Sequence, residues 1–192
     1  MEENDMIICG YQGIGKSTLA RDRLICDKFP VIDLESGNFW VDGKRSNDWY
    51  KIYANIAVHL SQQNNIVMLS SHKVVRDYLY DLHSGERLAT IYPAIDLKDE
   101  WIEKLQQRYD LSKKEKDYKA LMNAKEMYEE NIRDLANQSG FDHIQLNADY
   151  YSLEFVITKY YLLTTMLLDE KPILQKDDED ATIILKEYNE NE

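Results

Sequence analysis

Residues 10–17 read GYQGIGKS and fit the pattern G-x-x-x-x-G-K-[ST] at every fixed position. An apolar run at 6–9 precedes them and a helical apolar stripe follows, which is the strand, loop and helix context that the pattern requires. Glycines let successive backbone N–H groups turn toward phosphate oxygens, the lysine reaches the β- and γ-phosphates, and the hydroxyl ligates Mg²⁺. We therefore expect a nucleoside triphosphate site with its metal at Ser17. Its expected members are Gly10, Gly13, Ile14, Gly15, Lys16, Ser17 and Thr18.

Apolar runs typical of strands alternate with segments of helical periodicity along the rest of the chain. Strands are expected at 6–9, 31–35, 66–69, 88–92 and 142–146, and helices at 16–27, 48–60, 74–82, through 98–139 and at 152–168. Such alternation predicts an α/β fold with a five-stranded parallel sheet and helices on both faces. The 192 residues are enough for one domain, expected at 1–170, followed by an acidic tail at 171–192.

The net charge of −12 disfavours general nucleic-acid binding, because a polyanion is repelled at long range. The segment from residue 176 onward carries −5 of this charge, and the rest of the chain is still acidic. The chain has no run of 18 apolar residues and no N-terminal signal pattern, so we expect a cytoplasmic protein that does not bind membranes. Cys9 and Cys26 lack metal-ligand spacing and are expected to be buried thiols. A homodimer is left open.

Asp33 and Glu35 end the second expected strand. In an open parallel sheet the ligand lies outside the carboxyl ends of the strands, so both can face the crevice that holds the phosphate loop. There they could bind a substrate hydroxyl, act as a general base or hold Mg²⁺ through water; a solvated turn with a capping role is the alternative. The third strand ends in Ser70-Ser71-His72, where many phosphate-loop proteins place a metal-binding aspartate, and this disfavours a mechanical ATPase.

In this order of motifs the chain resembles the nucleotide and small-molecule kinase group of phosphate-loop proteins, which includes nucleoside monophosphate kinases, gluconate kinase and shikimate kinase. The resemblance rests on residues 10–17, 33–35, 70–73 with Arg76-Asp77, a basic helical segment after the fourth strand, and 147–149. It is most like uncharacterised nucleotide kinases of the phage and prophage type. It implies the three-layer P-loop NTPase fold with a helical lid, expected at about 98–139.

Residue by residue, the resemblance implies an acceptor pocket lined by Asp33, Glu35 and Arg76, with Lys44 and Arg45 closing over an anionic acceptor. It implies a lid arginine that stabilises the transferring phosphoryl group. Arg108 is the first candidate and Arg133 the second, with Lys98 and Lys104 also available. It also implies that Asn147 and Ala148 pack the adenine ring. A surface ion pair for Arg76 and solvated surroundings for the loop and lid cations are the alternatives.

We therefore expect ATP-dependent phosphoryl transfer to a small acceptor, with Mg²⁺, and most plausibly to a (deoxy)nucleoside monophosphate. Lys16, Arg108 and Asp33 are the expected catalytic residues. If the acceptor were a nucleoside or a sugar acid, Asp33 would be the base that accepts the hydroxyl proton. A regulatory protein that binds ATP without catalysis is a further alternative, and a kinase of nucleic-acid ends is disfavoured by the charge.

Overall fold

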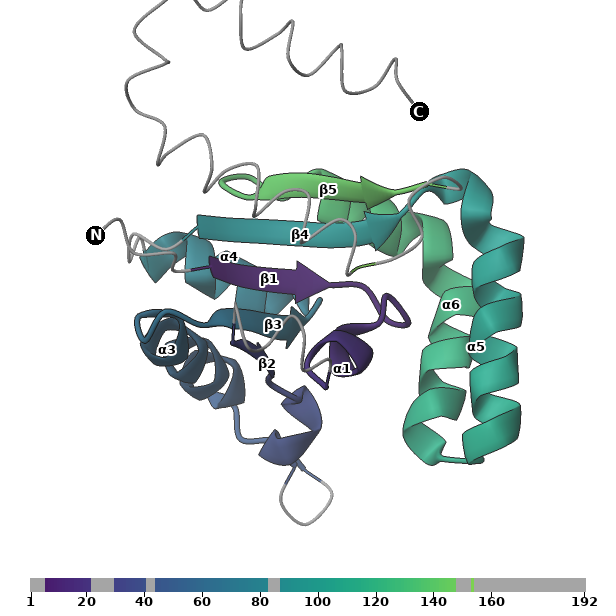
Figure 1. The fold of residues 1–192 in the computed structure, drawn as a ribbon, viewed down its shortest axis with the longest axis horizontal. Coiled ribbons are helices and arrows are strands. Elements are labelled where there is room, and N and C mark those ends of the chain that lie inside the picture. Colours follow the sequence, from purple (N-terminus) through teal and green to yellow (C-terminus); the bar gives the residue numbers. More distant parts are fainter. Residues whose placement is uncertain (1–5, 22–29, 41–43, 83–86, 148–152, 154–192) are drawn as a thin grey trace, which may run out of the picture. The chain divides into compact units, whose positions relative to one another are not determined.

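A computed structural model describes residues 6–21, 30–40, 44–82, 87–147 and 153 (Figure 1). The strands are β1 (Met6–Gly10), β2 (Val31–Asp33), β3 (Ile66–Ser70), β4 (Arg87–Pro93) and β5 (Asp142–Leu146). The helices are α1 (Lys16–Leu19), α3 (Trp49–Ser61), α4 (Lys73–Leu82), α5 (Lys98–Ser112) and α6 (Glu115–Ala136), with 3₁₀ turns η1 (Ser36–Phe39) and η2 (Ile95–Leu97). The expected last helix and acidic tail lie outside the described residues, and the domain limit at residue 170 stays a prediction.

The five strands form one parallel sheet in the order β2-β3-β1-β4-β5. This confirms the predicted α/β fold. Gly10, the last residue of β1, is in register with Ser70 of β3 and with Ile91 of β4. The loops that follow β1, β2 and β3 therefore leave the sheet at one edge, where the sequence places the phosphate loop, the carboxylates and His72.

One face of the sheet packs on α3 and α4. Alternate residues of the two central strands point to this face, as the two-residue period of a strand requires. Its fully buried members include Ile7, Cys9, Val67 and Leu69 from β1 and β3, Tyr53 and Ala57 from α3, and Val75 and Leu79 from α4. Burial raises the pKa of the Cys9 thiol to about 12, so this cysteine is an unreactive part of the core, as predicted. Cys26 lies outside the described residues.

Helix α3 forms where predicted, but its apolar stripe is wider than the part that meets the core. Tyr53, Ala54 and Ala57 are fully buried, whereas Ile52 is 51% exposed and Ile56 38% exposed. Side chains separated by three and four positions spread over more than one direction on a helix, so the periodicity predicted the helix without fixing which apolar residues it buries.

The segment expected to form the lid is an antiparallel pair of helices, α5 and α6, beside the carboxyl ends of β1 and β4 (Figure 1). The chain reverses at Lys113, whose φ of 52° is left-handed, and Lys114 precedes the first turn of α6. Met127 has non-helical backbone angles and marks a kink inside α6. We call this pair the helical hairpin. None of the helices in the described part of the chain has the length and apolar character needed to span a bilayer.

Candidate active site

The phosphate loop, residues 10–17, joins β1 to α1 as predicted. Two of its glycines have positive φ, 84° at Gly13 and 101° at Gly15, which residues with a Cβ adopt rarely. The N–H groups of Thr18 and Leu19 both donate to the carbonyl of Gly15 at 3.0 Å, so the helix begins directly at the loop. This turn places the motif lysine at the first helical position.

Lys16 is folded back into its own loop. Its Nζ donates to the carbonyl oxygens of Gly10 at 2.9 Å and Tyr11 at 3.1 Å. Burial lowers the pKa of this ammonium to about 8, and the positive charge of Arg108 acts in the same direction, while Asp33 and Glu35 oppose them. A buried cation that donates to neutral carbonyls gains more from an anionic partner. Phosphate oxygens would be such a partner and would accept hydrogen bonds from the ammonium.

Ser17 and Asp33 meet at the carboxyl ends of β1 and β2. The Ser17 hydroxyl donates to Oδ2 of Asp33 at 2.5 Å. Hydroxyl and carboxylate oxygens are the donors that Mg²⁺ prefers, and this ion usually keeps several waters and takes further ligands from phosphates. The pair therefore fits a magnesium site with Ser17 as a ligand and Asp33 on the same side, in the arrangement that the sequence predicts.

The helical hairpin braces the phosphate loop from outside. Nε1 of Trp101, a fully buried residue of α5, donates to the carbonyl of Gln12 at 2.9 Å. The Gln12 side chain donates to the carbonyl of Ala120 at 2.7 Å and to Oδ1 of Asn123 at 3.1 Å, both on α6. A Cβ at Gly13 would lie 3.2 Å from Trp101 Nε1, so a glycine there also permits the close approach of the indole. The sequence analysis did not single out Gln12 or Trp101 for this contact.

Arg108, on α5, carries a positive charge that lowers the pKa of Lys16. It forms an ion pair of 2.6 Å with Asp117 of α6. The other candidate lid cations are engaged elsewhere. Lys98 and Arg133 both pair with Glu129, at 3.3 and 3.1 Å, and the Lys104 ammonium lies 4.3 Å from the Trp101 ring centre. Each of these cations thus has a partner within the helical hairpin, and the choice of Arg108 as the lid arginine stays a prediction.

On the acceptor side, Glu35 and Arg45 belong to two different contacts. Glu35, which follows β2, pairs at 3.0 Å with Lys116 of α6, so the tip of the helical hairpin reaches this edge of the sheet. Arg45 donates to the carbonyl and hydroxyl oxygens of Ser36, at 2.9 and 3.1 Å, and its guanidinium stacks 4.0 Å from the ring centre of Trp49. Both predicted residues are therefore near Asp33, although each already has a partner.

His72 follows β3 at the same edge. Its Nε2 lies 3.0 Å from the Ser36 hydroxyl, and its ring meets Trp49 edge to face at 5.2 Å between centres. Burial, and then the charges of Arg45, Arg76 and Lys16, lower the pKa of His72 to about 4. The imidazole is therefore neutral near pH 7 and contributes polarity without charge.

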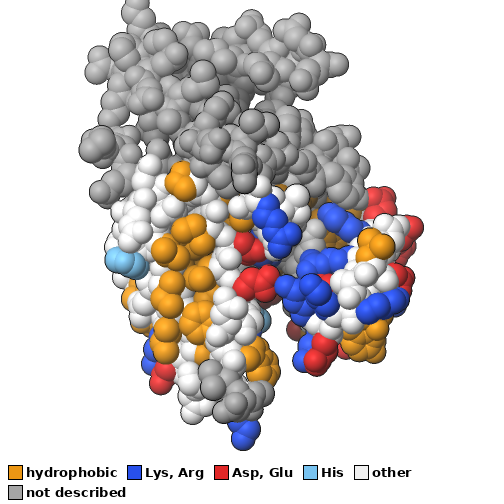
Figure 2. All heavy atoms as spheres, turned by 60° about the horizontal axis from the view of Figure 1, so that its bottom comes forward, with side chains coloured by type: hydrophobic (Ala, Val, Ile, Leu, Met, Phe, Trp, Pro, Cys, Tyr) orange, Lys and Arg blue, Asp and Glu red, His pale blue; other side chains and the backbone are white. Residues whose placement is uncertain are grey.

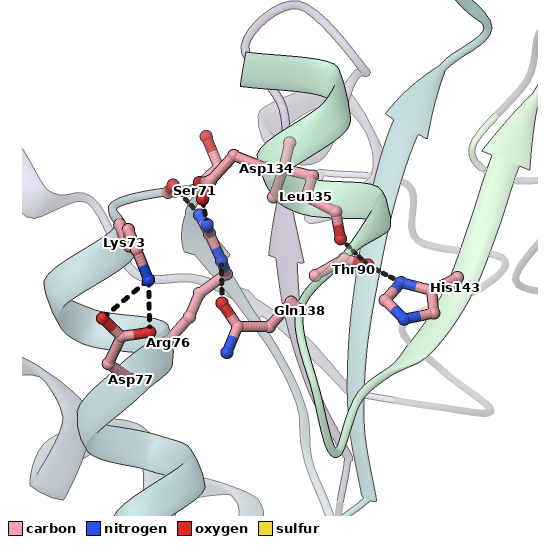
Figure 3. A network of polar contacts seen from close by, with 9 residues as sticks. All are labelled: Ser71, Lys73, Arg76, Asp77, Thr90, Asp134, Leu135, Gln138 and His143. Atoms are coloured by element: carbon pink, nitrogen blue, oxygen red, sulfur yellow. Dashed lines mark hydrogen bonds and ion pairs between the residues drawn. The ribbon is translucent and has the colours of Figure 1, made fainter. Parts of the chain in front are cut away.

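Arg76 departs from the role that the resemblance implies. Its side chain is 1% exposed and sits between α4 and α6, where it forms an ion pair with Asp134 and donates to Gln138 at 3.0 Å and to the carbonyl of Ser71 (Figure 3). In this arrangement the donors of Arg76 are taken up by partners within the protein and its guanidinium is closed to solvent, so a role in binding the acceptor stays a prediction. Arg76 instead fixes the end of α6 against α4.

The adenine-side prediction is only half covered by the structure. Asn147 follows β5 and makes contacts within the protein, whereas Ala148 lies outside the described residues. Their proposed packing on adenine stays a prediction.

Figure 2 shows a hollow between the helical hairpin and the part that carries the sheet, with lysine and arginine side chains gathered on the hairpin and acidic side chains opposite. The pair of Lys116 with Glu35 follows the same division of charge. The cations on the hairpin would therefore attract anionic phosphates into this hollow.

No protein-family model matches the chain, and no curated protein matches it. Among solved structures, a gluconokinase from Sinorhizobium meliloti 1021 is similar at a TM-score of 0.51 and 14% identity, over 91% of this chain and 98% of that one. A protein from Chloroflexus aurantiacus J-10-fl, provisionally named a kinase, gives a TM-score of 0.45 at 12% identity, over 86% and 98%. At such identities the likeness concerns the fold. Together with the loop geometry, the first of these matches shows that the chain has the α/β fold of the phosphate-loop kinases.

Proposed function

We propose that the protein transfers the γ-phosphoryl group of ATP to a small acceptor, and that this acceptor is a (deoxy)nucleoside monophosphate. The observation that carries this proposal is the convergence on Lys16. Lys16 lies in a loop of the phosphate-binding pattern. Its pKa is raised by the charges of Asp33 and Glu35, on the β2 side, and lowered by the charge of Arg108, on the helical hairpin. A pure binding module needs the loop alone, whereas an arginine brought toward it from a separate hairpin suits phosphoryl transfer.

The described residues would divide the work as follows. Backbone N–H groups of residues 13–18 bind the phosphates, and Lys16 exchanges its two carbonyl partners for β- and γ-oxygens. Ser17 and Asp33 hold Mg²⁺, which would neutralise charge on the same oxygens. Arg108 stabilises the charge of the transferring group. Catalysis is then positioning and electrostatic stabilisation, with little covalent chemistry left to the protein.

The bond between Ser17 and Asp33 bears on the acceptor. The hydrogen bond from the Ser17 hydroxyl to Oδ2 of Asp33 supports a role for Asp33 on the metal side of the site, and a phosphate acceptor needs no strong base. A sugar acid or nucleoside acceptor would require Asp33 to accept a hydroxyl proton instead. The similarity in fold to a protein named a gluconokinase keeps the sugar acid as the second candidate.

The test is acceptor-dependent ADP formation from ATP and Mg²⁺, with nucleosides, nucleoside monophosphates and sugar acids as a panel. We expect turnover with one or more monophosphates and its loss in Lys16→Ala, whose folding is checked by thermal melting. Turnover with only a sugar acid or a nucleoside would move Asp33 to the base role. ATP binding without turnover on any acceptor would contradict the kinase proposal and favour a regulatory ATP-binding protein.

A further inference from the structure

We propose that Asp117 is a positioning residue for phosphoryl transfer, which holds Arg108 in the orientation needed to contact the γ-phosphate of ATP. This inference rests on the proposed function. Asp117 stands in the first turn of α6, across the turn of the helical hairpin from Arg108. The sequence analysis did not single it out.

The geometry of Asp117 is that of a fixed anchor. Its side chain is 4% exposed, and its two oxygens have different partners: Oδ1 lies 2.6 Å from the Arg108 guanidinium, and Oδ2 accepts from the Ser112 hydroxyl at 2.5 Å. The Ser112 oxygen in turn accepts from the N–H of Lys114 at 3.2 Å. The carboxylate therefore has one oxygen hydrogen-bonded to the last residue of α5 and the other in an ion pair with Arg108, and its burial leaves it little freedom to move.

Arg108 is the more exposed partner of the pair. Its side chain is 47% exposed, and the pair with Asp117 is made through one terminal nitrogen, Nη2. A guanidinium has five N–H donors in a planar fork, so one edge can remain on the carboxylate while another binds phosphate oxygens. The charge of Arg108 also contributes to the lowered pKa of Lys16. Asp117 thus restrains one terminal nitrogen of the arginine and leaves the rest of its guanidinium uncovered.

A competing role is purely structural, since an acidic side chain in the first turn stabilises any helix. Glu115 provides the matched control. It lies in the same turn, is 79% exposed and pairs with Lys119 at 2.7 Å, away from Arg108. Glu115→Gln removes the same charge from the same helix end, whereas Asp117→Asn also removes the anchor of the arginine while keeping an oxygen for Ser112.

The experiment measures the affinities for Mg·ATP and Mg·ADP by calorimetry, and kcat where turnover is found. The variants are Asp117→Asn, Glu115→Gln, Arg108→Ala and the Arg108→Ala/Asp117→Asn double variant. Only ATP has a γ-phosphate, so the ratio of the two affinities reports the contact of Arg108 without requiring an acceptor. We expect Asp117→Asn to lower this ratio about tenfold and kcat by about 10- to 100-fold, with a smaller change in ADP affinity. Glu115→Gln should change each by less than about twofold.

In the double variant, Asp117→Asn should add little to the loss caused by Arg108→Ala, because the two residues act as a unit. An unchanged ATP-to-ADP ratio in Asp117→Asn, or equal effects of the two acidic variants, would overturn the inference. Increased kcat in Asp117→Asn would also overturn it, since Asp117 would then restrain Arg108 away from the phosphate. If the variants show the expected ratios but the wild type phosphorylates no acceptor, the proposed function fails, whereas the part of the inference in which Asp117 holds Arg108 against the γ-phosphate is supported.

Discussion

Two arginine–aspartate pairs hold the helical hairpin at its two ends. In one pair the arginine is the buried partner, and in the other the aspartate is. Where α6 ends against α4, the arginine of the Arg76–Asp134 pair is 1% exposed and the aspartate 36% exposed. At the hairpin turn, the arginine of the Arg108–Asp117 pair is 47% exposed and the aspartate 4% exposed. The same two residue types therefore put the carboxylate outside at one end and the cation outside at the other.

The difference indicates which arginine can serve a ligand. The Arg76 guanidinium already donates to Ser71, Asp134 and Gln138. Removing it would leave buried acceptors without a hydrogen bond. A guanidinium anchored from behind by a buried carboxylate keeps donors for a phosphate. Motif position alone ranked both arginines as functional, whereas burial separates them.

The largest effect is expected from Arg108→Ala. This change removes the cation that would stabilise the transferring phosphoryl group, and kcat should fall by about 10³-fold or more. Acceptor-dependent ADP formation measures the loss, and thermal melting of the same preparation serves as the control for folding. A variant with near wild-type kcat would remove Arg108 from the catalytic group and break the comparison.

Arg76→Met should act on stability instead. Leaving buried acceptors without a donor costs about 1–3 kcal/mol, and here Gln138 and the Ser71 carbonyl lose the donors of Arg76, whereas Asp134 is 36% exposed and can be solvated. Urea unfolding gives the free energy of unfolding directly. Activity per folded molecule should remain close to that of the wild type. A stable variant with a raised KM for the acceptor would return Arg76 to the acceptor pocket.

Lys16 differs from both arginines because its ammonium donates to backbone carbonyls and, among the described residues, has no carboxylate partner in a hydrogen bond. Its pKa of about 8 means that the free protein loses this charge as pH rises through 8, whereas bound polyphosphate favours the protonated form. ATP affinity should therefore fall about tenfold between pH 7 and pH 9, with proton uptake on binding. Calorimetry in buffers of different ionisation enthalpy measures both quantities. A flat profile would show that the lysine charge does not titrate in this range.

His72 should give the smallest effect. The pKa of His72 is about 4 in the folded protein, below the ordinary value of 6.5, so the unfolded chain binds the proton more tightly. The free energy of unfolding therefore decreases as pH falls from 6.5 toward 4. Between pH 7 and pH 5, wild type should lose about 1 kcal/mol more than His72→Gln, with solvent screening of a partly exposed ring allowed for. Urea unfolding at both values tests it, and parallel losses in the two proteins would contradict the pKa assignment.

The fold and the phosphate side of the site were predictable from the sequence because their determinants are local. The glycines and Lys16 lie within eight consecutive residues, and the strand and helix periods are read within single segments. Asp33 was also placed correctly, since parallel strands deliver their carboxyl ends to one edge. None of these predictions requires knowing which side chains far apart in the sequence pair with each other.

The partners of the charged residues were not predictable in the same way. Arg76 and Asp134 are 58 residues apart, and their pairing depends on where α6 ends against α4. Arg108 and Asp117 are closer in sequence, but their contact requires the left-handed turn at Lys113. Both acids stand among other acids on α6, and the sequence carries no signal for which of them is buried.

The hydrogen bond of Trp101 to the phosphate loop makes its fluorescence a reporter of changes in that loop. Its N–H is bonded to the Gln12 carbonyl within the loop, and its ring is fully buried. Indole emission responds to changes in hydrogen bonding and local field, so occupancy of the loop should change the fluorescence of an unlabelled protein. Trp40 and Trp49 lie on the opposite side of the crevice beside Arg45, and their replacement by phenylalanine would leave a single-tryptophan signal at the loop.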